Sequence, residues 1–156
     1  MKLLKKFFIL TLSMVICFSI PFSIFAQSTT TTDTVKEYLE DGSYIVTEFE
    51  QSITPFSSGT VSKVKTATYY NSDDERQWSV SIKGTFTYTG SSATCTSAST
   101  SYKIYDSAWK VTQATATRSG RTATGEFIVK KYWLGIITKT IPIKVVATCD
   151  NNGNVS

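Results

Sequence analysis

Large apolar and small polar residues alternate along much of this chain. The stretch "WSVSIKGTFTYTGSSATC", from Trp78 to Cys95, shows the pattern with few breaks. Its even positions up to residue 88 read Trp78, Val80, Ile82, Gly84, Phe86 and Tyr88, and the odd positions between them are Ser, Lys and Thr. A period of two over a dozen residues is typical of a β-strand with one buried and one solvated face. We therefore expect Trp78 in the core rather than on an exposed aromatic platform.

The same period returns further along the chain. One predicted inward face holds Ile141, Ile143, Val145, Ala147 and Cys149, and another holds Phe127, Val129 and Trp133. Clusters of Gly, Ser, Asn and Asp separate these runs, and "EDGS" at 40–43 contains Asp-Gly, a strong hairpin signal. "WLGI" at 133–136 is another such turn. The pattern predicts strands at about 35–39, 43–53, 60–71, 76–89, 93–105, 109–118, 122–133 and 136–149.

Nearly every link between these strands is short, so strands adjacent in sequence are expected to pair antiparallel. A meander of this many strands must close or fold over on itself to bury one face. We predict an all-β fold, an antiparallel β-sandwich built from consecutive hairpins, with a closed up-and-down barrel as the alternative. The composition also favours β-structure. Between residues 27 and 156 there are 41 Ser and Thr residues, aromatic residues are abundant, and there is no run of helix formers.

The first 26 residues have the organisation of a secretory signal peptide. Lys2, Lys5 and Lys6 precede an apolar run that Pro21 interrupts, and Ala26 offers a small residue for cleavage. A retained membrane anchor is the alternative reading, because the run approaches the length that spans a bilayer. We expect residues 27–34 to be a flexible Thr-rich segment and residues 35–156 a single β-domain. The prediction is a secreted, extracellular protein with no stable membrane span after signal removal.

Removal of the signal peptide changes the charge balance. The chain has 16 basic and 12 acidic residues, and without the three lysines before residue 7 the balance falls from +4 to 13 against 12, or +1. A near-neutral chain lacks the basic footprint of nucleic-acid binding. Residues 27–56 hold six carboxylates against one lysine, whereas residues 57–156 hold twelve basic against six acidic residues. The acidic front can pair with the basic body, or the basic body can meet an anionic wall polymer.

Two cysteines remain after residue 26, Cys95 and Cys149. In an oxidising compartment they are expected to form one structural disulfide. A bond closing this 55-residue loop contributes about 4 kcal/mol in the chain-entropy model. Alternation back from Ile104 turns Cys95 outward while Cys149 points inward, and a bulge near 97–101 would reconcile the two.

Aromatic residues near turns or in adjacent pairs are the candidates for a binding surface. Tyr69 and Tyr70 cannot both face inward, and Tyr105 and Trp133 lie beside turns. Tyr and Trp are amphipathic and suit contact with sugar rings. We predict a binding surface drawn from these four residues.

The chain contains no histidine, which removes Ser-His and Cys-His nucleophile pairs and the usual zinc sites. The carboxylates Glu48, Glu50 and Glu126 are the remaining catalytic candidates, and they read as solvated strand residues rather than a glycosidase pair. The "NSDDER" segment at 71–76 lacks the ligand spacing of a calcium loop. We predict no enzyme, no metal site and no cofactor.

Three segments, "EYLEDGSYIVT", "KTATYYNSDDERQWSVSIKGTFTYTGSSATCTSAS" and "CDNNGNVS", resemble small uncharacterised secreted proteins of Gram-positive bacteria. These share a DGSY hairpin, a TYYNS turn, a GTFTY strand and two late cysteines, and the resemblance covers most of residues 37–156. It implies export and the disulfide, and it carries no activity or catalytic residue to this chain. Those proteins tend to have Gly in the TYYNS turn, where this chain has Asp73-Asp74-Glu75.

Two classes of function follow. The first is a secreted, non-catalytic β-domain that binds wall glycan, an anionic polymer or a protein at the cell surface. The second is a bacteriocin-like or toxin-like effector acting on other cells, since long amphipathic strands can rearrange in a membrane.

Overall fold

The computed structural model describes the backbone at residues 30–52 and 58–156 and the side chains at 34–49 and 58–156. Within that part of the chain the regular secondary structure is entirely strand. The strands are β1 (Thr30–Tyr38), β2 (Tyr44–Ser52), β3 (Gly59–Tyr70), β4 (Arg76–Tyr88), β5 (Ala93–Ile104), β6 (Trp109–Ser119), β7 (Thr122–Trp133) and β8 (Ile136–Thr148). Every predicted strand is present, and most ends differ by one residue from the prediction.

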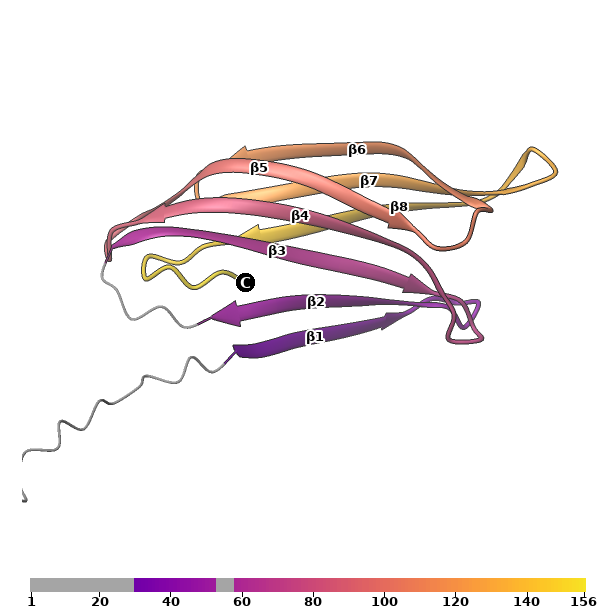
Figure 1. The fold of residues 1–156 in the computed structure, drawn as a ribbon, viewed down its shortest axis with the longest axis horizontal. Coiled ribbons are helices and arrows are strands. Elements are labelled where there is room, and N and C mark those ends of the chain that lie inside the picture. The colour runs from indigo at the N-terminus through magenta and orange to yellow at the C-terminus, as the bar shows by residue number, and fades with distance from the viewer. Residues whose placement is uncertain (1–29, 53–57) are drawn as a thin grey trace, which may run out of the picture.

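The eight strands form two antiparallel sheets that face each other (Figure 1). The larger sheet has the order β1-β2-β3-β4-β5 and the smaller one the order β6-β7-β8. Within each sheet every hydrogen-bonded neighbour is also the neighbour in sequence. The predicted all-β sandwich of consecutive hairpins is therefore confirmed, and the closed-barrel alternative is wrong because the strands form two separate ladders.

The inward-facing residues predicted from the alternation make up the core. Trp78, Val80, Ile82 and Phe86 of β4 are fully buried against Val129 of β7 and its neighbours. Phe127, Ile141, Val145, Ala147 and Cys149 are also buried. Trp133 is the exception among the predicted inward residues, because it lies at the end of β7 beyond the cover of the larger sheet and is 70% exposed.

The two lateral margins of the sandwich differ. Between β5 and β6 the margin is bridged, since the Cys95 N–H donates to the Gly120 carbonyl at 2.7 Å and Arg118 Nη1 donates to the Thr96 carbonyl at 2.6 Å. At the other margin β1 and β2 extend past β8 (Figure 1). A groove of about 660 Å³ lies there, lined by β1, β2 and β3 on one wall and by β8 on the other.

A β-bulge settles the orientation of Cys95. In the β4–β5 ladder Thr85 pairs with Ser97 and Phe86 pairs with Cys95, so that Thr96 is the extra residue. The bulge lies one residue before the predicted range 97–101 and turns Cys95 into the core, where Cys95 and Cys149 both bond to the β6–β7 turn. Both cysteines are buried. The structure holds them as two thiols rather than as a disulfide, so the disulfide stays a prediction.

The start of the domain differs from the prediction. Strand β1 begins at Thr30, so most of the segment 27–34 that was expected to be flexible pairs with β2. The predicted signal peptide, residues 1–26, lies outside the described residues. Among the described residues, no helix is long and apolar enough to cross a bilayer.

Candidate functional site: a tyrosine and cation ladder on the larger sheet

The four predicted surface aromatics do not form one patch. Tyr70 and Tyr105 lie on the outer face of the larger sheet, whereas Trp133 lies at the tip of the β7–β8 hairpin. Tyr69 is a core residue and only 3% exposed, so its inclusion in a binding surface needs correction. Its ring stacks on Trp78 with centroids 5.1 Å apart and meets the edge of Trp109 at 5.2 Å.

The outer face carries a cross-strand row that sequence reasoning found only in part. In register, Tyr38 of β1 pairs with Tyr44 of β2, Tyr44 pairs with Tyr70 of β3, and Tyr70 pairs with Arg76 of β4. Tyr105, just past β5, continues the row beyond Arg76. Regular alternation along β3 turns Tyr69 into the core and Tyr70 outward, and a bulge that leaves Gln77 of β4 as the extra residue places Arg76 beside Tyr70.

The rings in this row contact each other directly. Tyr44 and Tyr70 are stacked with centroids 5.0 Å apart and planes 11° from parallel, and Tyr38 lies 5.5 Å from Tyr44 with a 51° tilt. Aromatic pairs at these separations are mutually stabilising. Tyr38 is 67% exposed and Tyr105 40% exposed, whereas Tyr44 between them is only 8% exposed, so the row presents ring surface to solvent mainly at its two ends.

Three cations lie over the rings. Lys36 Nζ is 3.5 Å from the Tyr44 centroid and 4.7 Å from that of Tyr38. The Arg76 guanidinium is 5.8 Å from the Tyr70 centroid and 5.2 Å from that of Tyr105. Lys103 Nζ lies 5.0 Å from the Tyr105 ring, and such cation–π contacts hold the charges at the aromatic surface. We call Lys36, Tyr38, Tyr44, Tyr70, Arg76, Lys103 and Tyr105 the tyrosine ladder.

Hydrogen bonds keep these groups charged and oriented. Bonding to the Tyr38 hydroxyl raises the pKa of Lys36, and bonding to the Tyr105 and Tyr70 hydroxyls raises the pKa of Arg76. A hydrogen bond with Ser79, assisted by Arg76, lowers the pKa of Tyr105. The ladder therefore presents fixed positive charge beside phenolic hydroxyls at neutral pH.

The acidic turn before β4 supports the ladder. The Tyr44 hydroxyl donates to Asp74 Oδ1 at 2.8 Å, which raises the pKa of Tyr44. Asn71 organises the turn by accepting the backbone N–H of Asp73 and Glu75 on its Oδ1. Among the described residues no group of three His, Cys, Asp or Glu side chains is arranged to hold a metal ion.

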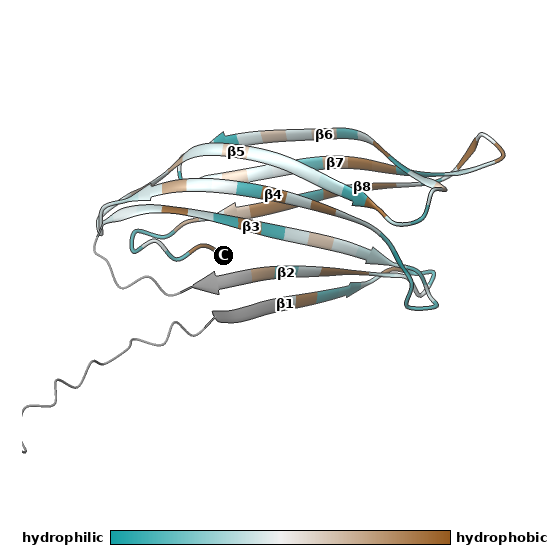
Figure 2. Cartoon of the chain, viewed as in Figure 1, coloured by the Kyte–Doolittle hydropathy of each residue, from teal (hydrophilic) through white to brown (hydrophobic). Residues whose placement is uncertain are grey.

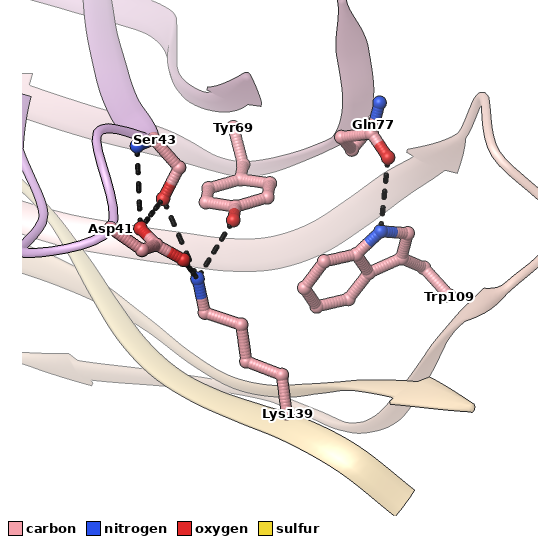
Figure 3. Close-up of polar contacts among 6 residues, drawn as sticks. All are labelled: Asp41, Ser43, Tyr69, Gln77, Trp109 and Lys139. Carbon is pink, nitrogen blue, oxygen red and sulfur yellow. Dashed lines mark hydrogen bonds and ion pairs between the residues drawn. The ribbon is translucent and has the colours of Figure 1, made fainter. Parts of the chain in front are cut away.

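A second polar cluster joins the two sheets at one end of the open groove (Figure 3). Lys139 of β8 forms an ion pair with Asp41 of the β1–β2 turn and donates to the Tyr69 hydroxyl at 2.9 Å and to Ser43 Oγ at 3.4 Å. The hydrogen bond from Lys139 lowers the pKa of Asp41 well below its usual range. Partial burial works to lower the pKa of Lys139, but its bonds to Asp41 and Tyr69 outweigh that effect and raise it.

Figure 3 also shows a hydrogen bond that crosses the core. Trp109 Nε1 of β6 donates to Gln77 Oε1 of β4 at 3.2 Å, and both residues are buried. Without this bond the buried indole N–H of Trp109 would have no partner, which would lower the stability of the fold. The Lys139 cluster and the Trp109–Gln77 bond both join the two sheets, and we interpret them as structural contacts.

The catalytic candidates do not converge. Glu48 of β2 is exposed, Glu126 of β7 lies 3.6 Å from Lys144 in an ion pair, and the side chain of Glu50 lies outside the described residues. Burial raises the pKa of the Cys95 and Cys149 thiols, which makes them weaker nucleophiles at neutral pH.

Five ladder residues were missed by sequence reasoning: Lys36, Tyr38, Tyr44, Arg76 and Lys103. The Asp-Gly signal places Tyr38 and Tyr44 on opposite arms of one hairpin. A two-residue turn at Asp41-Gly42 would pair Tyr38 with Ile45, whereas the observed loop at 39–43 pairs Tyr38 with Tyr44. The position of Arg76 depends on the bulge in β3–β4, which no local pattern announces.

No family model and no curated protein matches this chain. Among solved structures, the chain is similar to a hypothetical protein from Listeria monocytogenes EGD-e, with 17% sequence identity and a TM-score of 0.42. The match covers 80% of this chain and 91% of that chain. No function follows from this similarity.

Proposed function

We propose that this chain is a secreted, non-catalytic β-domain that binds an anionic glycan or polymer of the bacterial cell surface through its tyrosine ladder. The observation that carries the proposal is the row Tyr38–Tyr44–Tyr70–Arg76, with its cations, on the solvated face of the larger sheet. A rigid row that exposes phenol groups at Tyr38 and Tyr105 suits a saccharide chain, because phenol groups combine apolar contact with hydrogen bonding.

The charge of the ladder favours an anionic polymer over a neutral one. Lys36, Arg76 and Lys103 line the outer face, and Asp74, one of three carboxylates in the adjoining β3–β4 turn, accepts a hydrogen bond from Tyr44. Cations gathered along a groove or face concentrate anionic partners near it. The attraction is screened within about 8 Å at physiological salt, so binding is expected to weaken as salt rises.

Export and lineage belong to the same proposal. The predicted signal peptide and the resemblance to small secreted proteins of Gram-positive bacteria support a wall-facing location. Two buried cysteines on strands at the same end of the core support a disulfide formed after export.

Retention on purified cell walls tests the function. The purified protein is applied to walls with and without their anionic polymers, at low and at high salt. We expect retention on intact walls at low salt, and a loss of about five-fold or more when Arg76→Gln and Lys103→Gln remove two ladder charges.

The matched control is Lys83→Gln with Arg121→Gln, which removes the same charge from two exposed positions outside the ladder. This control should bind as the unmodified protein does. Equal loss in both double variants, or no retention at low salt, would contradict the proposal.

The effector alternative makes a different prediction. A bacteriocin-like or toxin-like protein is expected to inhibit neighbouring strains and to release dye from liposomes. A surface-binding domain does neither, so these two assays separate the classes.

A further inference from the structure

The β7–β8 hairpin ends in an exposed apolar tip. Trp133 is 70% exposed, Leu134 87%, Ile136 69% and Ile137 48%. We call these four residues the hairpin tip. They are four of the nine exposed large hydrophobic residues among those described, and Figure 2 shows the hairpin loop as a hydrophobic end projecting past the other turns. Contiguous apolar surface of this kind marks a contact site.

The turn at the tip places Leu134 in an unfavourable backbone conformation. Leu134 has φ 48° and Gly135 has φ 82°, and a two-residue loop with both central residues at positive φ is a type I′ turn. That turn favours Asn-Gly or Asp-Gly, because a leucine in the left-handed region crowds its own backbone. Folding alone would prefer asparagine here. The sequence instead keeps a large apolar side chain, in a strained conformation, at the outermost position.

The hairpin tip packs little against the rest of the described chain. A Cβ added at Gly135 would meet no atom within 4 Å, and the hairpin extends beyond the β1–β2, β3–β4 and β5–β6 turns at the same end (Figure 1). The tip therefore projects into solvent, with Leu134 as its most exposed side chain.

Lysines surround the base of the tip. Lys131 pairs across the strands with Lys139, and Lys130 pairs with Lys110 of β6. Lys131 lies over the core ring of Trp109, on the inner face, while Lys110 lies over Tyr132. We call Lys110, Lys130, Lys131 and Lys139 the lysine belt.

The belt contains like charges directly opposite each other, which destabilises an isolated hairpin. Lys139 is offset by Asp41, but Lys110, Lys130 and Lys131 have no ion pair within the described residues. The hairpin has four lysines and one carboxylate, Glu126, which pairs with Lys144, so Lys130 and Lys131 remain as its unpaired charges. The hairpin is thus complementary to a dense layer of negative charge.

We propose that the hairpin tip inserts into the interfacial region of an anionic lipid bilayer, with the lysine belt at the level of the lipid phosphates. Lys131 lies three residues behind Leu134, or about 10 Å at the rise of a strand. That spacing matches the depth of about 5–10 Å reached by peripheral apolar groups. Trp133 and Tyr132 then occupy the interface, where tryptophan and tyrosine concentrate.

The size and charge of the surface favour a bilayer over a protein. A stable protein interface buries about 800 Å² on each partner, which four side chains in and beside a two-residue turn do not provide. Two copies meeting tip to tip would bring two lysine belts together and repel. The carboxylates Glu40, Asp73 and Glu75 lie in turns set back from the hairpin, so only the hairpin reaches the lipid (Figure 1).

Sedimentation with lipid vesicles tests the inference. The purified protein is mixed with vesicles of one part phosphatidylglycerol to three of phosphatidylcholine, and in parallel with pure phosphatidylcholine. We expect binding to the anionic vesicles. Leu134→Asn should lower the partition coefficient about ten-fold or more, because it removes the deepest apolar side chain.

Leu134→Asn also separates lipid contact from a role in folding. Asparagine suits the type I′ turn, so the variant should unfold at a higher temperature while it binds less. The matched control Val64→Thr removes apolar surface from an exposed position on β3 and should leave binding unchanged.

The contribution of the lysine belt to lipid binding is tested with a separate double variant. Lys110→Gln with Lys130→Gln should reduce binding to anionic vesicles about ten-fold or more at low salt, whereas Lys83→Gln with Arg121→Gln should not. Absence of binding to anionic vesicles would overturn the inference. So would binding that Leu134→Asn leaves intact, or concentration-dependent dimerisation that Leu134→Asn abolishes, because a second copy would then be the occupant. The inference uses no residue of the tyrosine ladder, and either can fail without the other.

Discussion

Two glycines show how single residues set the spacing between the sheets. A Cβ at Gly84 of β4 would lie 2.4 Å from the Phe86 ring and 3.1 Å from the Ala123 Cβ, and a Cβ at Gly125 of β7 would lie 2.9 Å from the Phe127 ring. Each glycine thus makes room for the phenylalanine two residues on along the same face. The close approach of the sheets depends on the absence of these side chains.

Gly84→Ala is therefore expected to destabilise the domain by about 1–3 kcal/mol, the usual effect of overpacking a core. Phe86 is fully buried, so its ring has no free space to enter. Chemical denaturation measures the change, with Lys83→Ala on the exposed face as the control. An unfolding free energy equal to that of the unmodified protein would show that the sheets separate without cost.

At the scale of elements, the ion pair between Lys139 and Asp41 joins β8 to the β1–β2 turn across the open groove. The pair spans the division between the acidic front of the chain and its basic body. Both side chains are partly exposed, so the expected contribution is about 1 kcal/mol or less.

The pH dependence of this contribution has a definite sign. The folded pKa of Asp41 is depressed, so its stabilisation is present above the unfolded pKa of about 4 and is lost as the pH falls below it. The folded pKa of Lys139 is raised, so its part is present below an unfolded pKa of about 10.4 and is lost at higher pH. In the Asp41→Asn variant the unfolding free energy should therefore fall less steeply as the pH is lowered below about 4. A limb as steep as in the unmodified protein would assign it to other carboxylates.

A second link between elements is the predicted Cys95–Cys149 disulfide. The Cys95 N–H bonds the Gly120 carbonyl and the Cys149 N–H bonds the Arg121 carbonyl, so both cysteines adjoin the same β6–β7 turn. In protein recovered from an oxidising compartment we expect Cys149→Ser to lower the unfolding free energy by up to about 4 kcal/mol. Reductant should have the same effect on the unmodified protein and none on Cys95→Ser with Cys149→Ser. Two thiols that react with an alkylating reagent after unfolding would show that the bond does not form.

At the scale of the whole molecule, the meander places its functional candidates at one end. Because consecutive strands are antiparallel, the β1–β2, β3–β4, β5–β6 and β7–β8 turns all lie at the same end of the sandwich (Figure 1). The tyrosine ladder occupies the outer sheet face near that end, and the hairpin tip projects beyond it. The proposed polymer contact and lipid contact would therefore approach the molecule from neighbouring directions.

Local periodicity and turn chemistry determined the elements. Alternation of apolar and polar residues predicted strand positions and inward faces, as with Trp78 and Val80, because a pleated strand turns successive side chains to opposite sides. Asp-Gly and Leu-Gly turns were found for the same local reason. The need for a bulge near Cys95 also followed, since two inward cysteines conflicted with strict alternation.

Only the tertiary structure decided which side chains meet. Arg76 lies beside Tyr70 in the ladder because a bulge at Gln77 shifts the β3–β4 register, and Lys139 pairs with Asp41 across the open groove. Trp133 shares a period with buried Phe127, yet it is exposed because β7 runs past the edge of the larger sheet. Strand register and the extent of cover by the opposite sheet depend on contacts far apart in sequence, so the periodicity of a single strand contains neither.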